Sequence, residues 1–524
     1  MKKLILLINL FVVINVVAQT DAALKYAPLI TGTELKKHLS VIASEEFEGR
    51  ETGTEGQRKA AAYIESQFKL MGLQPVKSLK GYQQFYPLYI DSIAGISLMI
   101  DNKKAEFGKD YYSQLSISET GKFKSKKIIF IGYGIDDKNY TDYTNIDVKG
   151  KIVLFFSGEP KKDNKYLLSG TNRSSAEWSL GINKKLLLAA SKGAIGALVI
   201  NPAQGSFNQR TIDNNKKTNI YYPRKKDKIL NHAYLSHDFA KNILGNNADT
   251  ILKIAKTWQP ISNQWALEKN TKIEYTFEKS HNMINASNVI GVVEGSDKKD
   301  EYVFVTGHYD HLGKRDGKIY YGADDDGSGT VGVMLMAQIF AKAKAEGKGP
   351  RRTMVFMTVS GEEKGLWGSE YYSDHPFFPL EKTSADLNID MVGRTDTERK
   401  TADTLNYVYV VGHDKLSSDL PVINEGVNNK YTQLVFDYKF DDPNDKNRIY
   451  FRSDHYNFAR KGIPVLFFYD GMLLADYHQP TDTVDKINWD LYEKRVQMIF
   501  HTAWEIANRN EMLKRDIPLP EESK

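Results

Sequence analysis

The sequence predicts an α/β fold with a mixed, largely parallel sheet sandwiched by helices, accompanied by a second, β-rich module. Beyond about residue 287, short apolar strand patterns alternate with helical ones, which is typical of a parallel sheet covered by helices. Residues 125–235 have a different sequence pattern, with short runs of β-forming residues between polar turns. The 524 residues also exceed one ordinary domain, so we expect two or three.

The chain begins with a pattern typical of a secretory signal peptide. Lys2 and Lys3 precede an apolar stretch over 4–17 that ends at the small residue Ala18. We therefore expect a signal peptide at 1–18 and an exported protein, either periplasmic or secreted. A retained N-terminal anchor is the alternative. The stretch is too short for a comfortable membrane span, which needs about 20 apolar residues, so no stable membrane insertion is expected.

Helical and strand patterns follow in order along the chain. Apolar residues at three- and four-residue spacing predict helices within 33–73, interrupted by a glycine-rich loop at 45–57. The middle region gives strands at 128–131, 152–156 and 197–200, a helix beginning at 186, and a polar loop at 205–228. The last region gives a helix over 329–345 and strands at 302–306, 354–359, 387–389, 408–411 and 465–469.

Composition and missing motifs exclude several classes of function. The 71 basic and 66 acidic residues nearly balance at +5, which argues against a nucleic-acid partner. The chain has no cysteine, so disulfides, a cysteine nucleophile and a thiolate zinc site are impossible. It also lacks a His-Glu-x-x-His motif, a serine nucleophile elbow and a phosphate-binding loop.

Potential metal ligands follow nearly every predicted strand of the last region. His308 and Asp310 come after the first of these strands and, by strand alternation, point the same way, so Asp310 can orient the imidazole. Asp324, Asp325 and Asp326 precede the predicted helix, where three adjacent carboxylates repel one another unless cations are present. An EF-hand calcium loop does not fit, because its twelfth position is not glutamate.

Further ligand types complete the set. Adjacent Glu362 and Glu363 cannot point the same way, so one can bind a metal while the other faces the substrate as a base. Asp390 follows another strand, and His478 has Asp482 nearby to orient it. Each motif alone has an ordinary structural explanation. Together they give two histidines and three carboxylates, too many for one tetrahedral zinc but suited to two metals sharing a carboxylate.

Five ordered segments carry a resemblance to a known family. GHYDHLG, GADDDGSG, SGEEKGLWGS, NIDMVG and YHQPTDT resemble the dinuclear zinc exopeptidases of the aminopeptidase Y, bacterial leucyl aminopeptidase and glutamate carboxypeptidase II type. The segments GYGI, DVKGKIVLFF and AASKGAIGALVIN resemble the protease-associated (PA) domain inserted in many members. The resemblance implies a discontinuous peptidase domain over 24–120 and 282–512, a PA-like insertion with its connecting segment at 121–281, and a C-terminal tail at 513–524.

The resemblance also implies a role for each residue. Asp325 matches the carboxylate that bridges two Zn²⁺ ions, and a cis peptide often follows it. The other expected site residues are His308 and Asp390 on one zinc, Glu363 and His478 on the other, Glu362 as the general base, Asp310 as the group that orients His308, and Tyr450 as a hydrogen-bond donor to the oxyanion.

The function implied is release of N-terminal residues from peptide substrates. A carboxypeptidase of the glutamate carboxypeptidase type is the first alternative, for which Arg448 and Arg452 could grip a terminal carboxylate. A receptor-like binding module without metals is the second. Glutaminyl cyclases share the fold with one zinc, and the five-ligand set argues against them. The preferred side chain and the oligomeric state are not predicted.

Overall fold

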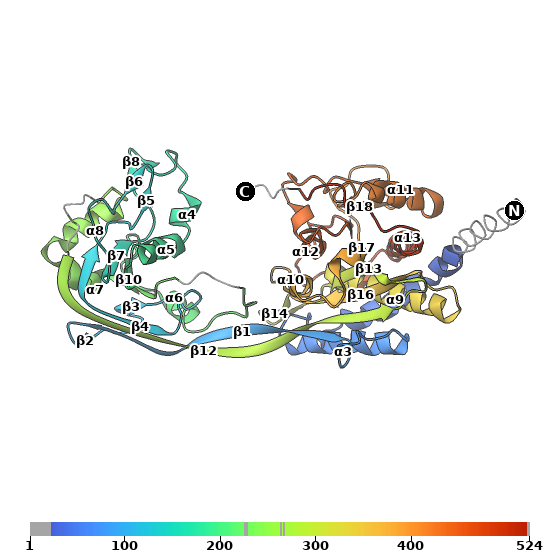
Figure 1. Cartoon of the computed structure of the whole chain (residues 1–524), viewed down its shortest axis with the longest axis horizontal. Coiled ribbons are helices and arrows are strands. Elements are labelled where there is room, and N and C mark those ends of the chain that lie inside the picture. The colour runs from blue at the N-terminus through green and yellow to red at the C-terminus, as the bar shows by residue number, and fades with distance from the viewer. Residues whose placement is uncertain (1–21, 225–228, 262–264, 266–267, 521–524) are drawn as a thin grey trace, which may run out of the picture. The chain divides into compact units, whose positions relative to one another are not determined.

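A computed structural model of the chain describes residues 22–224, 229–261, 265 and 268–520. The predicted signal peptide at 1–18 lies outside the described residues. The chain divides into two compact units (Figure 1). Unit 1 consists of Met1–Pro87 and Asn285–Lys524, and unit 2 consists of Leu88–Ile284. Every predicted site residue belongs to unit 1.

Unit 1 is built on a mixed, largely parallel sheet, which confirms the predicted fold class. Antiparallel pairing occurs between β12 and β16 and between β18 and β20, and the remaining neighbours are parallel. Across the sheet the strands are β19 (Val435–Asp437), β18 (Tyr407–Val411), β20 (Val465–Tyr469), β17 (Thr383–Ile389), β13 (Lys298–His308), β16 (Arg352–Val359) and the C-terminal end of β12 (Glu268–Val293). A separate hairpin pairs β14 (Gly313–Arg315) with β15 (Lys318–Tyr320).

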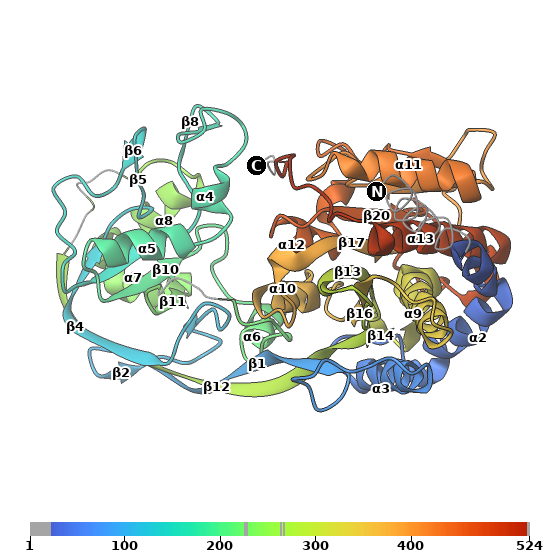
Figure 2. The ribbon, with the colours of Figure 1, turned by 45° about the vertical axis from the view of Figure 1, so that its right-hand side comes forward.

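Helices cover both faces of this sheet because its strands are apolar on both sides. In β13, Val303 and Val305 enter the core cluster that contains α9, whereas Phe304 packs on the other face against Tyr372 and Phe458. Figure 2 shows α9 and α10 on opposite sides of β13 and β16. The helices are α2 (Gly32–Ile42), α3 (Glu55–Leu70), α9 (Gly329–Ala345), α10 (Trp367–Asp374), α11 (Asp419–Tyr431), α12 (His455–Ala459) and α13 (Trp489–Asn508).

The local sequence signals explain where these helices begin and end. Thr31 accepts a hydrogen bond from the backbone N–H of Glu34, which caps α2. The polar stretch predicted as a loop separates α2 from α3 and contains one short turn of 3₁₀ helix, Glu45–Phe47. Helix α9 begins and ends at the predicted residues, and all but a few of its side chains are buried.

Unit 2 is rich in strands, as expected from the sequence, but its mixed sheet has helices on both faces, more than the one or two that were expected. Its strand order is β12, β4 (Gly121–Phe130), β7 (Ile152–Phe156), β10 (Gly196–Ile200), β11 (His232–Leu235) and β3 (Tyr111–Tyr112). Its helices are α4 (Ala176–Ser179), α5 (Asn183–Ser191), α6 (Gln209–Asn214), α7 (His237–Leu244) and α8 (Ala248–Lys256). Helix α6 lies inside the predicted loop over 205–228. The short helices were missed because their apolar faces span only one or two turns.

Short strands complete unit 2. They are β2 (Lys103–Lys104), which pairs with β1 (Gln83–Ile100), and the hairpins of β5 (Asp136–Asp137) with β6 (Tyr140–Thr141) and of β8 (Lys161–Lys162) with β9 (Lys165–Tyr166).

The two compact units divide at positions that differ from the expected bounds of the inserted part. The first lies between Pro87 and Leu88, not after residue 120, and the second lies at Ile284, three residues beyond the expected 281. Both fall inside long continuous strands, β1 and β12, so neither coincides with a loop between elements. The change of composition near residue 121 coincides instead with the start of β4.

The expected C-terminal tail at 513–524 is also corrected for its described residues. Leu513 is buried, and its N–H donates a hydrogen bond to Ser384 Oγ. Leu519 packs against two apolar clusters of unit 1. Leu513 and Leu519 therefore attach this segment to unit 1, although the charged residues between them are exposed.

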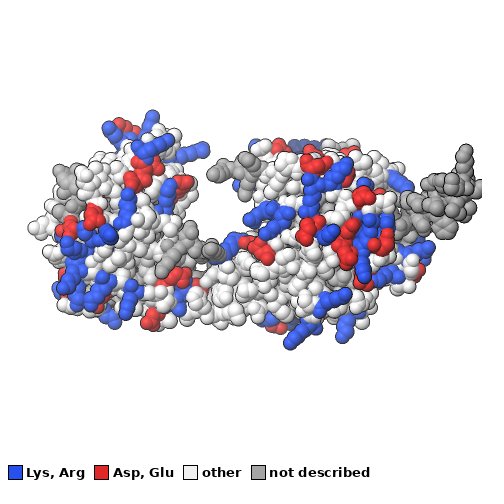
Figure 3. Space-filling model, viewed as in Figure 1, with Lys and Arg blue, Asp and Glu red and all other residues white. Residues whose placement is uncertain are grey.

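The surface carries both signs of charge. Figure 3 shows acidic and basic side chains interspersed over the visible face of unit 1, which agrees with the near-balanced composition. Within the described part of the chain, no helix combines the length and apolar character needed to cross a membrane.

Candidate metal centre

The predicted ligands gather at one edge of the unit 1 sheet. His308 is the last residue of β13, Asp390 follows β17 directly, and Glu363 follows β16 by four residues. These three strands are parallel neighbours, so their carboxyl ends meet at the same edge. Asp325 comes from the segment before α9, and His478 from the loop after β20. Residues 170 positions apart in sequence thus converge at one edge, through the order of the parallel strands and the path of two connecting segments.

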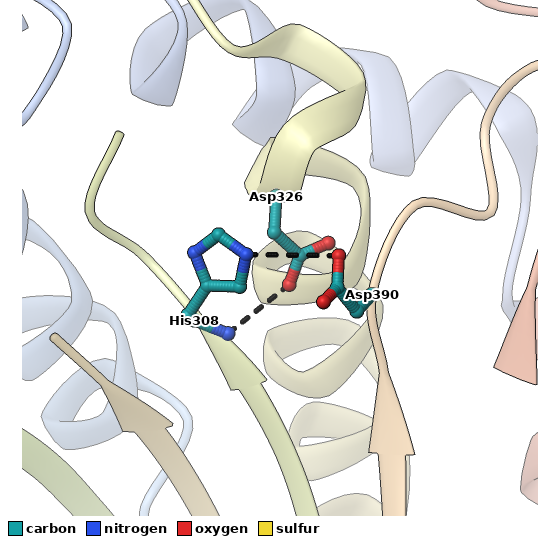
Figure 4. A group of neighbouring side chains, drawn as sticks. All are labelled: His308, Asp326 and Asp390. Atoms are coloured by element: carbon teal, nitrogen blue, oxygen red, sulfur yellow. Dashed lines mark hydrogen bonds and ion pairs between the residues drawn. The ribbon is translucent and has the colours of Figure 1, made fainter. Parts of the chain in front are cut away.

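The first half of the centre joins His308, Asp325 and Asp390. His308 Nε2 lies 3.3 Å from Asp325 Oδ1 and 3.6 Å from Asp390 Oδ1. His308 is almost completely buried. Figure 4 shows His308 and Asp390 directed toward one another from the ends of neighbouring strands, with Asp326 beside them. His308 therefore has a carboxylate oxygen from each of Asp325 and Asp390 within 3.6 Å of the same ring nitrogen.

The second half joins His478, Asp325 and Glu363. His478 Nε2 lies 3.2 Å from Asp325 Oδ2 and 3.0 Å from Glu363 Oε2. Asp325 therefore presents one carboxylate oxygen to His308 and the other to His478. That is the arrangement expected of a carboxylate shared by two metals, and the structure brings all five predicted ligands together around it.

The chemistry of these residues fits metal binding. Two imidazoles and three carboxylates are nitrogen and oxygen donors of the kind zinc takes. His308 Nε2 and Asp325 Oδ2 are buried with no hydrogen-bond partner among the described residues. Burial opposes protonation of His478, but Asp325 and Glu363 outweigh it and raise its pKa to about 10. The carboxylates thus create a negative field in which a bound cation would take the place of imidazole protons.

Asp326 fixes the backbone around the first half of the centre. Its Oδ2 accepts a hydrogen bond from the His308 N–H at 3.1 Å, and its Oδ1 accepts from the N–H groups of Gly329 (2.8 Å) and Met391 (3.0 Å). One carboxylate therefore connects β13, α9 and the end of β17. The peptide bond between Asp325 and Asp326 is cis, as the family resemblance implies.

Asp482 has a different contact from the one expected. The sequence suggests that it orients His478, but its carboxylate instead accepts hydrogen bonds from the N–H groups of Asp324 and Asp325, each at 3.1 Å. It therefore holds the segment that carries the shared carboxylate. The loop after His478 turns back toward α9, a path that sequence spacing does not reveal.

Asp310 contacts His308 mainly through its backbone. His308 Nδ1 lies 3.1 Å from the Asp310 carbonyl oxygen and 3.7 Å from its carboxylate. The carboxylate accepts hydrogen bonds from Thr52 Oγ1 (2.7 Å) and from the Glu362 N–H (3.2 Å). Asp310 thus lies between His308 and Glu362 and can position both.

Glu362, the expected base, lies at the edge of both halves. Its Oε2 is 3.8 Å from His308 Nε2, and the residue lines a cavity together with Asp325 and Asp390. Burial raises the pKa of the Glu362 carboxyl well above its usual range. A carboxylate with a raised pKa beside a metal centre is suited to accept and return a proton.

Tyr450 does not reach the centre, which corrects the expected oxyanion donor. The 3₁₀ turn Ile449–Phe451 places its ring in a buried aromatic cluster against Phe451 and His455, and it does not line the cavity. Tyr477 lines the cavity instead, and its hydroxyl accepts a hydrogen bond from Arg452 Nη2 at 2.9 Å. Its position next to His478 is a signal that the sequence analysis did not use.

His311 is a second residue that the sequence analysis left without a role. It is fully buried, and its Nδ1 lies 2.7 Å from Glu363 Oε1 and 3.8 Å from Asp325 Oδ2. Strand alternation would direct it away from His308. Because β13 ends at His308, that alternation no longer applies three residues later.

The chain is similar to several known proteins. Residues 288–503 match the model of peptidase family M28. A probable zinc metalloprotease of Pyrenophora teres f. teres (strain 0-1) is 29% identical over 184 residues, covering 32% of this chain and 38% of the relative. A probable leucine aminopeptidase of Trichophyton verrucosum (strain HKI 0517) is 25% identical over 258 residues, covering 47% and 66%. The solved aminopeptidase from Aneurinibacillus sp. strain AM-1 has a TM-score of 0.49 and 18% identity, covering 95% of this chain and 100% of that chain.

The fold and the site define a class: an α/β unit with histidine and carboxylate donors at the carboxyl ends of its parallel strands. Residues 288–503 match the peptidase family M28 model, which supports the resemblance to dinuclear zinc exopeptidases for this segment. The chain spans about two-fifths of the length of the first curated relative that it matches.

Proposed function

We propose that the protein is an exported zinc exopeptidase with two zinc ions, acting as an aminopeptidase that releases N-terminal residues from peptides. The observation that carries the proposal is the position of Asp325, whose two oxygens face His308 and His478 while Glu362 borders the same cavity. The names of the relatives, zinc metalloprotease and leucine aminopeptidase, support zinc and exopeptidase activity.

The chain's own residues divide the chemistry among them. Bound zinc ions would supply a Lewis acid for the scissile carbonyl and lower the pKa of the attacking water. Glu362 accepts a proton from that water and returns it to the leaving amine. Its backbone N–H donates a hydrogen bond to the Asp310 carboxylate, which fixes the backbone that carries the Glu362 side chain. Tyr477, at the cavity wall, is placed to donate a hydrogen bond to the developing oxyanion.

Replacing Glu362 with glutamine tests the proposal. The amide has nearly the same shape but cannot take up a proton, so kcat is expected to fall by about 10²–10⁴-fold. Zinc content, measured by elemental analysis, is expected to remain that of the wild type, because Glu362 is not among the five proposed ligands. Retained turnover on peptides in Glu362→Gln would contradict the base assignment, and loss of zinc would contradict the ligand assignment.

One observation keeps a carboxypeptidase activity as the second candidate. Arg452 lines the cavity and contacts Tyr477, so its guanidinium can meet a substrate carboxylate. Arg448, the other arginine expected for this role, is not among the cavity-lining residues. An amino-acid anilide and an N-acylated dipeptide separate the two activities. Cleavage of the first alone supports the aminopeptidase, and cleavage of the second alone overturns it.

Export is part of the proposal and has its own test. The apolar N-terminal stretch and the small residue Ala18 support cleavage there. Sequencing of the mature N-terminus from the secreted or periplasmic fraction is expected to begin at Gln19. A PA-like identity for unit 2 is likewise proposed on the segments quoted above, with no role assigned to it.

A further inference from the structure

His311 is a buried imidazole directed at the metal centre. It lies beyond the end of β13, is fully buried, and neither ring nitrogen has a hydrogen-bond partner among the described residues, although Nδ1 lies 2.7 Å from Glu363 Oε1. A buried imidazole whose ring nitrogens make no well-directed hydrogen bond is costly, which indicates that another group completes its environment.

The backbone is shaped to admit this ring. Gly322 has a positive φ of +55°, and a Cβ there would lie 2.5 Å from His311 Cγ. Only glycine therefore lets the ring pack against the segment that leads to Asp325. The donor atoms of His311, Asp325 and Glu363 all lie within 4.8 Å of one another, as one cation requires. The ring centres of His311 and His478 are 5.8 Å apart, and each ring has a nitrogen within 3.8 Å of both Asp325 and Glu363.

We propose that His311 is a sixth metal ligand, binding through Nδ1 the metal held by Asp325, Glu363 and His478. The inference rests on the metal-dependent function proposed above and adds to it an asymmetry. The second half then has four protein donors and is closed, whereas the first half has three, His308, Asp325 and Asp390, and keeps an open position. The closed half holds its metal tightly, and the open half is where water and substrate enter.

Zinc titration of the metal-free full-length protein against a chromophoric chelator measures this directly. The wild type is expected to bind two zinc ions with distinct affinities. Loss of an outer contact to a metal ligand weakens binding by about 10–100-fold, so loss of a direct ligand in His311→Ala is expected to weaken the tighter site by at least about 100-fold. His478→Ala is expected to weaken the same site, and His375→Ala, an exposed histidine of unit 1, is expected to change neither.

A second variant separates ligation from positioning. His311→Asn keeps an N–H donor for Glu363 but has no imidazole, so ligation predicts weakened binding there too. Wild-type affinity in His311→Asn would show that His311 only orients Glu363 and would overturn the proposal. Unfolding midpoints of the metal-free variants, compared with metal-free wild type, check that each is folded. If an alanine variant is unfolded, the asparagine variant decides.

The zinc titration tests the His311 assignment separately from peptidase activity. Two zinc ions of distinct affinity without peptidase activity would overturn the proposed function and leave the His311 assignment standing. Unchanged zinc affinity in both His311 variants, with normal peptidase activity, would overturn the His311 assignment and leave the proposed function standing. A wild type that binds no zinc would overturn both.

Discussion

Two tyrosines near the centre show how a single residue's environment decides its role. Tyr477 and Tyr450 are both close in sequence to expected site residues, yet only Tyr477 lines the cavity beside the carboxylates. Tyr450 is fully buried among aromatic rings. A hydroxyl can stabilise an oxyanion only if it reaches the point where the charge develops, so position outweighs residue type.

A pair of matched substitutions tests this distinction. Tyr477→Phe removes one hydroxyl from the cavity wall and is expected to lower kcat by about 10²–10³-fold, with a smaller effect on KM. Tyr450→Phe removes a hydroxyl from a buried cluster and is expected to leave kcat near the wild-type value. Steady-state kinetics on one peptide anilide measures both. Equal effects of the two substitutions would contradict the assignment.

At the scale of elements, the centre depends on how strands and one helix are tied together. The Asp326 carboxylate accepts hydrogen bonds of at most 3.1 Å from three backbone N–H groups. These belong to β13, to the start of α9 and to the residue after Asp390. The Asp482 carboxylate similarly accepts hydrogen bonds from the backbone N–H groups of Asp324 and Asp325. Ligands on different elements keep their spacing because these carboxylates, which bind no metal in our assignment, fix the backbones that carry them.

Replacing Asp326 with asparagine tests this link. The amide group offers an N–H where the wild type accepts one, so at least one buried hydrogen bond is lost. The free energy of unfolding is expected to fall by about 1–3 kcal/mol, measured by urea denaturation of the metal-free protein. Zinc affinity is expected to fall as well, because His308 loses its backbone anchor. Asp300→Asn, an exposed position of the same strand β13, serves as the control and is expected to change neither value.

At the scale of the whole molecule, buried charges couple stability to metal and to pH. Asp325, Glu363 and Asp390 place three carboxylates together, and their mutual repulsion favours unfolding unless cations are bound. Unit 2 has its own buried charge, Lys185 on α5, whose ammonium donates hydrogen bonds to the carbonyl oxygens of Phe156 (3.1 Å) and Gly158.

Metal removal is expected to destabilise unit 1. A ligand bound only by the folded state and present at about 1,000 times its Kd contributes about 4 kcal/mol. Dialysis against a chelator is therefore expected to lower the thermal unfolding midpoint of unit 1, and zinc is expected to restore it. Magnesium is the control, because it favours all-oxygen sites with several waters and does not suit histidine ligands. Superimposable calorimetric traces with and without chelator would contradict metal binding.

Stability at alkaline pH is expected to report on Lys185. Burial lowers the pKa of its ammonium from 10.5 to about 7, so between pH 7 and 10.5 the unfolded chain holds a proton that the folded chain has released. Stability from this group therefore rises with pH across that window, by up to about 1.4 kcal/mol per pH unit. Below pH 7 Lys185 is protonated in both the folded and the unfolded chain, so its destabilising effect no longer changes with pH.

Urea denaturation of the Lys185→Met variant between pH 7 and 10 checks this effect. The variant lacks this rise, so its unfolding free energy is expected to fall relative to that of the wild type as pH increases. Lys184→Met, at the more exposed neighbouring position of α5, is expected to show a pH-independent difference. A pH-independent difference for Lys185→Met as well would contradict the lowered pKa.

The sequence by itself determined where the main strands of unit 1 lie along the chain, the helix α9 and the residue types of the metal centre. These follow from local rules: hydrophobic periodicity marks each element, and ligands placed directly after parallel strands must meet at one edge. His308, Asp325 and Asp390 are predictable for this reason, because each lies within a few residues of an element's end.

Only the tertiary structure decided what lies farther from those ends. The position of Tyr477 instead of Tyr450 in the cavity, the contact of Asp482 with the segment before α9, and the inward direction of His311 depend on how loops fold back over the sheet. The unit boundary at Leu88 depends on a strand that continues unbroken through it. Loop paths are set by packing against distant residues, and neither periodicity nor spacing encodes those contacts.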